Sequence, residues 1–200
     1  MVDGVYAIVM TLLVLELSPP DASNVQEVLQ RLQGLEPKAV AFVIGFVVAA
    51  SGWAYVHQVG LLFTRSNLLH EVINLLALMF ASLIPFGASI MGSFPHTFYG
   101  PATYSLIVGV LTLIYALDLA LCQRTLIPPV VDRRLIWTIL GLAIAAGLWC
   151  LFVGLVIAPW NPALALWALG LHLLAHWTCM FGAQRRVRQA AKAAQRWHAR

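Results

Sequence analysis

The sequence predicts an all-α integral membrane protein with six transmembrane helices in each subunit and both termini in the cytoplasm. The 200-residue chain is 61% hydrophobic and only 10% charged, with a mean hydropathy of +0.85, whereas a soluble domain is about a quarter charged. Its apolar residues form long continuous runs, unlike the short alternating segments of a transmembrane β-barrel. Because a helical span needs about 20 residues, six spans fit within this length.

The apolar runs place the spans within one domain over residues 1–184. The first span, at about 2–18, is short and is closed by a Ser-Pro-Pro turn, so we expect a few further residues of this helix upstream. The other spans are expected at about 38–63, 67–92, 101–122, 134–158 and 162–184. Pro85 lies inside the third of them and predicts a kink there.

Residues 24–34 predict a short amphipathic helix on the extracellular side, between the first two spans. Asn24 and Glu27 have the spacing of a capping box. An apolar stripe with helical spacing follows at Val25, Val28, Leu29 and Leu32. We expect this helix to lie on the membrane surface or to pack on the helix ends.

The basic residues set the orientation. With the first helix running outward, ten of the twelve lysines and arginines lie inside, and only Arg31 and Lys38 lie outside. The positive-inside rule favours this arrangement, so the net charge of +4 does not indicate a nucleic-acid partner. The basic segment 185–200 is expected to be a cytoplasmic tail that anchors on anionic headgroups, or else a specific lipid or partner site.

The first helix carries one apolar stripe. Its members fall within an arc of about 100° on a helical wheel, and they are Ile8, Thr11, Leu12 and Leu15. Glu16 lies beside the stripe at its outer end. Such a stripe is either a face that packs against another helix or the lining of a pore, with Glu16 concentrating cations at the mouth. Periodicity alone does not separate these two interpretations.

Three segments, in matching order and spacing, resemble the transmembrane protein 175 family of potassium channels. Asp3–Glu16 is similar to the start of the family's first helix, although Met1-Val2 stands where the family has Phe-Ser. Trp53–His57 resembles the family's aromatic–His segment in the second helix, and Asn74–Phe86 resembles its third-helix pattern. The likeness covers roughly residues 1–92.

The resemblance implies a passive potassium channel of modest selectivity in the inner membrane of a bacterium. Bacterial members of the family carry one six-helix repeat and assemble as homotetramers, with the first helices around a central pore. Ile8 then corresponds to the constriction, Leu12 and Leu15 to further apolar layers, and Thr11 to a pore-facing hydroxyl. The expected ligands are permeant K⁺ ions and the expected surroundings are the bilayer, with no enzymatic activity, cofactor, bound metal or nucleic acid.

Two other functions stay open at this stage. A secondary transporter or proton-permeable carrier would need ionisable residues near the membrane midplane, and the middle of each expected span lacks acids and bases. A structural membrane protein without transport activity is the other alternative.

Polar side chains at membrane depth predict an interhelical hydrogen-bond network of Asp3, His57 and Asn74, because no water is available there to serve as a partner. A proton relay between Asp3 and His57 is the alternative interpretation. Asp118 is expected to pair with Arg124 or with a basic residue of the adjoining loop, or to stay hydrated at the interface.

Three potential metal ligands lie on one face of the sixth span. His172, His176 and Cys179 are spaced i, i+4 and i+7, and zinc accepts both imidazole and thiolate ligands. Interfacial histidines and a buried thiol form the other interpretation, because no further ligand is evident at that depth.

Overall fold

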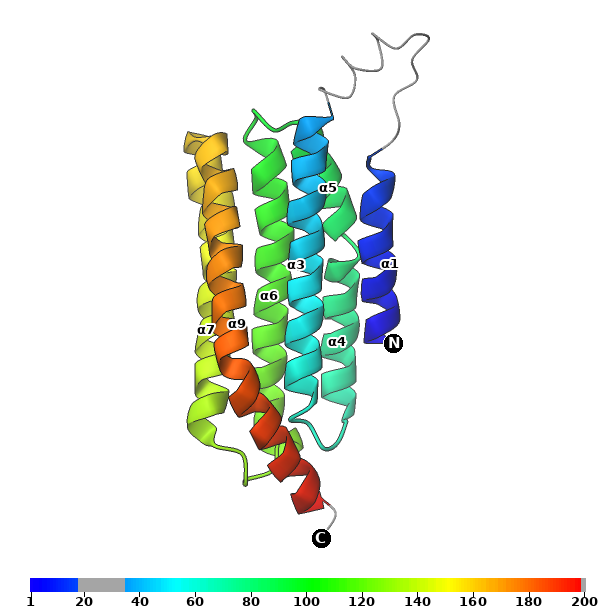
Figure 1. Ribbon diagram of the computed structural model, residues 1–200, viewed down its shortest axis with the longest axis vertical. Coiled ribbons are helices and arrows are strands. Elements are labelled where there is room, and N and C mark those ends of the chain that lie inside the picture. The colour runs from blue at the N-terminus through cyan, green and yellow to red at the C-terminus, as the bar shows by residue number, and fades with distance from the viewer. Residues whose placement is uncertain (18–34, 199–200) are drawn as a thin grey trace.

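The computed structural model describes residues 1–17 and 35–198, so the helix expected at 24–34 lies outside the described residues. The described helices are α1 (Val2–Leu15), α3 (Glu36–Gly60), α4 (Leu68–Ala81), α5 (Ile84–Ser93), α6 (Tyr99–Leu126), α7 (Arg133–Phe152), the π-helical turn η1 (Val153–Ile157), α8 (Ala158–Trp160) and α9 (Pro162–His198). They stand side by side in one bundle, with α1 on one flank and α7 and α9 on the other (Figure 1).

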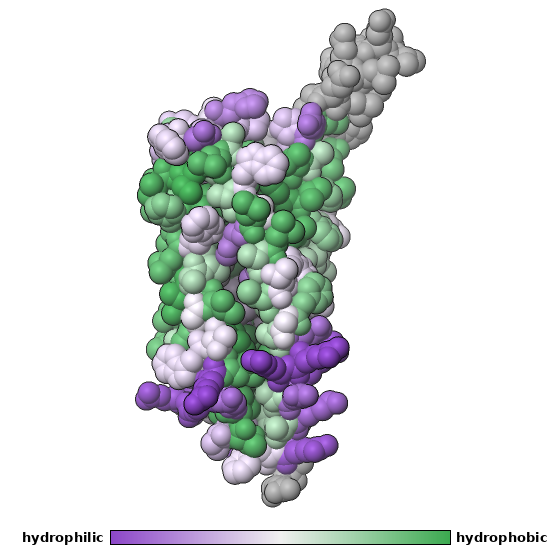
Figure 2. Space-filling view, turned by 60° about the vertical axis from the view of Figure 1, so that its left-hand side comes forward, coloured by the Kyte–Doolittle hydropathy of each residue, from purple (hydrophilic) through white to green (hydrophobic). Residues whose placement is uncertain are grey.

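Within the described part of the chain, five helical units are long and apolar enough to cross a membrane: α3, α4 with α5, α6, α7 with η1 and α8, and α9. The sixth helix, α1, has 14 residues, which is about 21 Å at 1.5 Å per residue. A broad apolar band covers the flank of the bundle between two more polar ends (Figure 2). Over residues 1–17 and 35–198, these observations confirm the predicted all-helical membrane class, with five candidate spans and the shorter apolar helix α1.

Two spans are interrupted at prolines. The third span breaks at Ser82 and Leu83, and Pro85 stands in the first turn of α5, where the missing N–H costs nothing. The disturbance expected at Pro85 is therefore a short interruption at Ser82 and Leu83, both of which keep right-handed helical backbone angles. In the fifth span, the π-helical turn η1 directly precedes α8, which carries Pro159 in its first turn. The π-helical turn accommodates the absence of a backbone N–H donor at Pro159.

The last helix is longer than the sequence pattern indicates. The sixth span was expected to end at 184, yet α9 continues without interruption to His198. Val187, Ala191 and Ala194 lie on one face of this extension and are buried. The basic segment from residue 185 to residue 198 is therefore the end of α9, packed through an apolar stripe beneath the bundle, rather than a separate tail (Figure 1).

The first helix packs against α3 at glycine residues. A Cβ added at Gly52 would lie 2.6 Å from the Tyr6 hydroxyl oxygen, and one at Gly45 would lie 2.9 Å from Leu13 Cδ2. Tyr6 and Leu13 are completely buried. Small residues allow such close approach between membrane helices, where lipid provides little hydrophobic drive for association. This contact fixes which face of α1 points into the subunit.

We expect Gly52→Ala to lower the stability of the folded subunit by about 1–3 kcal/mol, the usual cost of overpacking a filled core. The added methyl group would displace the Tyr6 ring, which is held in place by the contacts of its hydroxyl. Thermal unfolding in detergent measures the effect. Gly141→Ala is the matched control, since a Cβ there meets nothing within 4 Å. Equal melting temperatures for the two variants would contradict this packing.

Candidate functional site

The apolar stripe of α1 lies on the outer surface of the subunit. Ile8 and Leu15 are 59% and 66% exposed, and Leu12 and Thr11 are exposed as well. The opposite face of the helix, with Tyr6 at its centre, is buried against the bundle. The stripe is therefore available to contact lipid or another subunit, while the rotation of the helix about its axis is set by the buried face.

The polar side chains of α1 have local partners. The Thr11 hydroxyl donates a hydrogen bond of 2.8 Å to the carbonyl oxygen of Ile8, so its proton is held by the backbone of its own helix. Glu16 follows the last turn of α1, and it lines a small cleft together with Leu13 and Lys38. The cleft is therefore lined by one acidic and one basic side chain.

The residues of the expected polar network belong to two separate groups. Asp3 accepts a hydrogen bond of 2.8 Å from the indole nitrogen of Trp53. The His57 ring stacks on Trp53, with ring centroids 5.2 Å apart. Asn74 instead contacts His70, one turn earlier in α4. Among the hydrogen bonds of residues 1–17 and 35–198, none joins Asp3, His57 and Asn74 directly.

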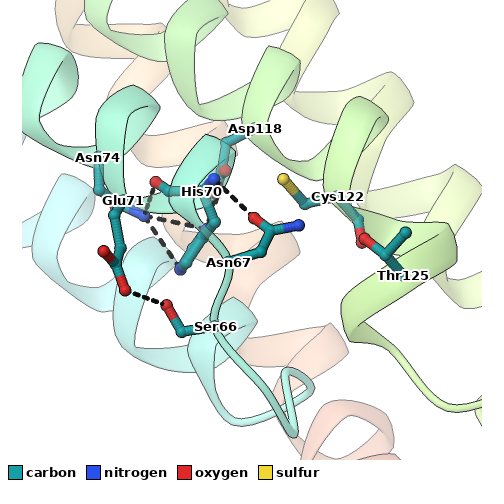
Figure 3. Close-up of polar contacts among 8 residues, drawn as sticks. All are labelled: Ser66, Asn67, His70, Glu71, Asn74, Asp118, Cys122 and Thr125. Carbon is teal, nitrogen blue, oxygen red and sulfur yellow. Dashed lines mark hydrogen bonds and ion pairs between the residues drawn. The ribbon is translucent and has the colours of Figure 1, made fainter.

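The second group links α4 to α6. His70 Nδ1 lies 2.9 and 3.0 Å from the two carboxylate oxygens of Asp118 (Figure 3). Asn67 caps α4 by accepting a bond of 2.8 Å from the His70 backbone N–H, which fixes the first turn of the helix that carries His70. The carboxylate of Asp118 is buried and pairs with His70. The expectation of a pair between Asp118 and Arg124 is therefore wrong.

A hydrogen bond between two tyrosines connects α1 to α6. The hydroxyl oxygens of Tyr6 and Tyr115 are 2.5 Å apart, and both residues are buried. The sequence analysis missed this pair because 109 residues separate its members and both lie in apolar runs. The available signal was the phenol group itself, since a hydroxyl at membrane depth requires a partner.

His172, His176 and Cys179 line a cavity of about 400 Å³ between α3, α6, α7 and α9. Most of its other lining residues are apolar. The imidazole rings are 6.3 Å apart between centroids, and these three residues do not form a three-ligand metal cluster among the residues that the structure describes. The flank in Figure 2 shows small hydrophilic spots within its apolar band.

The comparisons with known proteins all find similarity to potassium channels. Residues 1–85 match the model of the family described as endosomal/lysosomal potassium channel TMEM175. A potassium channel of Streptomyces collinus is 28% identical over 117 residues, which cover 56% of this chain and 57% of that protein. A potassium channel of Chamaesiphon minutus is 32% identical over 94 residues, 46% of each chain. The matches thus span about half the length of these curated relatives.

The fold has a solved counterpart. The crystal structure of a lysosomal potassium-selective channel TMEM175 homolog from Chamaesiphon minutus superposes with a TM-score of 0.80 and 20% sequence identity. The match covers 90% of this chain and 94% of that chain. The similarity of fold therefore extends over the C-terminal half, where the sequence family model gives no match.

We expect Tyr115→Phe to destabilise the subunit by about 1–3 kcal/mol, because the buried Tyr6 hydroxyl would lose its partner. The double variant Tyr6→Phe/Tyr115→Phe should be less destabilised than the sum of the two single variants, since neither hydroxyl then needs a partner. Thermal unfolding of all four proteins in detergent gives the coupling energy. Strictly additive effects would show that the two hydroxyl groups do not interact.

Proposed function

We propose that this chain, whose residues 1–85 match the TMEM175 family model, is a member of that family and forms a passive potassium-preferring cation channel. The subunits would assemble as a homotetramer in the inner membrane of a bacterium, with both termini in the cytoplasm. The relatives named as potassium channels support this function. The family is one of ion channels, and catalysis is no part of the proposal.

The observation that carries the proposal is the two-sided character of α1. One face is buried and anchored by Tyr6, while the other presents Ile8, Thr11 and Leu15 at the subunit surface. Four such helices around a symmetry axis would direct these stripes toward a common centre. The result would be a narrow apolar channel built from residues that the fold of the single subunit does not bury.

Selectivity would then arise at the apolar constriction. Rings of Ile8 and Leu12 would force an entering cation to shed part of its water, with Leu15 as a further layer. K⁺ holds its water less tightly than Na⁺ and would cross more easily. The sequence contains no Thr-Val-Gly-Tyr-Gly filter segment, so we expect a modest preference rather than that of a carbonyl cage.

Two polar side chains would assist conduction. Thr11 could offer its hydroxyl oxygen to a dehydrated ion, because that oxygen uses its proton in the bond to Ile8 and keeps its lone pairs. Glu16 at the mouth would attract cations, although Lys38 lines the same cleft. Both roles depend on α1 lining the pore.

One observation favours a proton-coupled carrier as a second candidate. The cavity of about 400 Å³ places two histidines, His172 and His176, within the helical bundle, and carriers use such intramembrane ionisable groups. Uphill uptake driven by a pH gradient and abolished by His176→Ala would support the carrier. Downhill flux that is insensitive to this substitution would support the channel.

We expect Ile8→Asn to increase total cation flux about tenfold, which corresponds to a barrier lower by ~1.4 kcal/mol. The ratio of K⁺ to Na⁺ flux should move toward one, because a polar ring relieves the cost of dehydration. Flux from proteoliposomes loaded with either ion measures both quantities.

Val14→Asn is the matched control for this substitution. Val14 is also exposed on α1, but it lies about 120° away from Ile8 around the helix. Its flux should equal that of the wild type. An unchanged rate and ion preference in Ile8→Asn, or equal effects of the two substitutions, would refute the assignment of the constriction.

We also expect the purified protein to behave as four copies of the 21.9 kDa chain in detergent. Light scattering coupled to size-exclusion chromatography, corrected for bound detergent, gives this mass. A pore shared between subunits requires an oligomer. A strictly monomeric protein with full transport activity would therefore rule out a shared pore.

A further inference from the structure

We propose that His70, Asp118 and Cys122 form a binding site for a divalent zinc-type metal ion that would tie α4 to α6. The proposal is independent of the channel function, and it departs from our expectation that the chain binds no metal. It rests on the arrangement of three different ligand types at the end of the bundle from which α9 extends (Figures 1 and 3).

The three side chains converge on one point. A ring nitrogen of His70, a carboxylate oxygen of Asp118 and the sulfur of Cys122 all lie within 4.8 Å of one another. Asp118 and Cys122 are four residues apart on α6, so they share one face of that helix. Zinc bonds to these atoms are about 2.0–2.3 Å long and point to the corners of a tetrahedron, so two ligand atoms of one ion lie about 3.5 Å apart. Small shifts of the three side chains would therefore bring all three ligand atoms within bonding distance of one ion.

The chemistry of the three ligands selects for zinc. Imidazole, carboxylate and thiolate together are ligands of zinc and related transition metals, whereas calcium and magnesium prefer oxygen alone. Three protein ligands leave a fourth position for water. The His70 side chain is 20% exposed, so an ion and its water would have access to the site from outside the core.

The charge balance of the cluster favours a cation. Asp118 is only 6% exposed and Cys122 is fully buried. In the part of the chain that the structure describes, the ion partner of the Asp118 carboxylate is an imidazole, which is charged only when it binds a second proton. A buried carboxylate is costly without a compensating charge. A bound divalent ion would provide that charge permanently.

Neighbouring groups already orient the ligands. Asn67 fixes the start of α4 through the His70 backbone. The Asn74 amide nitrogen lies 3.0 Å from the His70 carbonyl oxygen, and 3.0 and 3.1 Å from the ring nitrogens Nδ1 and Nε2 of the same residue. Second-shell contacts of this kind hold a metal-binding imidazole in place.

Metal binding would redistribute two protons. The Cys122 thiol would release its proton to solvent and bind as the thiolate. The proton that Nδ1 of His70 shares with Asp118 would move to Nε2 through solvent, so the ring stays neutral and offers the Nδ1 lone pair to the metal. The Asn74 amide would rotate so that its oxygen accepts this proton. One Nδ1–metal bond and one carboxylate–metal bond would replace the hydrogen bond between the two residues.

The test uses the full chain with Cys150→Ser and Cys179→Ser, which leaves Cys122 as its single thiol, since the chain has three cysteines. Cobalt(II) is the probe, because a thiolate ligand gives a charge-transfer band in the near ultraviolet. We expect this band to saturate at one cobalt per chain and to disappear when zinc is added. No thiolate band in this protein would overturn the proposal.

Two further variants locate the site. Cys122→Ser in the same background should abolish the charge-transfer band, and Asp118→Asn should weaken cobalt binding at least tenfold. His172→Ala/His176→Ala is the matched control and should leave the band unchanged. A band that Asp118→Asn leaves at full strength, or that the His172→Ala/His176→Ala control weakens, would refute the three-ligand assignment.

X-ray absorption of the zinc-loaded background protein requires no change at Cys122 and so avoids any folding defect of Cys122→Ser. We expect one sulfur atom together with nitrogen and oxygen atoms in the first shell. A shell of nitrogen and oxygen alone would show that zinc binds elsewhere.

Discussion

The contact of Tyr6 with Gly52 on one side and with the Tyr115 hydroxyl on the other fixes the rotation of the first helix, and the outward position of its apolar stripe depends on that rotation. In lipid, apolar side chains gain little from leaving their solvent, so close packing and paired polar groups decide how helices associate. Gly52 provides the close packing and Tyr115 the polar pair. With Tyr6 held inward, the helical period leaves Ile8 facing outward.

The six helices could be predicted because hydropathy reports directly on burial in lipid, but their ends could not. Pro85 predicted a disturbance of the third span. How far a proline interrupts a helix depends on whether the neighbouring backbone groups find other partners. Here the Ser82 hydroxyl donates a hydrogen bond to the Met79 carbonyl oxygen. The end of α9 was predicted too early because the apolar run stops at Arg185. A change from apolar to charged residues does not by itself end a helix. Backbone hydrogen bonds continue through the basic segment while Val187 still finds a packing partner.

Within the site, periodicity could identify the stripe of α1, since the face of a helix follows from residue spacing. It could not identify the partners of Asp3 and Asn74, which are Trp53 and His70. A partner depends on the rotation and crossing of two helices, and these are set by contacts such as that at Gly52. For the same reason the sequence suggested Arg124 for Asp118, whereas the fold brings His70 to that carboxylate.

The outward position of Ile8 and Leu15 has an evolutionary consequence. Surface residues contribute little to the stability of a subunit, so most substitutions there are tolerated by the fold, whereas changes at Tyr6 or Gly52 disturb the core. Selection can therefore vary the stripe with little loss of folded protein. Descendants of one scaffold could diverge in what the stripe recognises while the buried half of the same helix stays nearly constant.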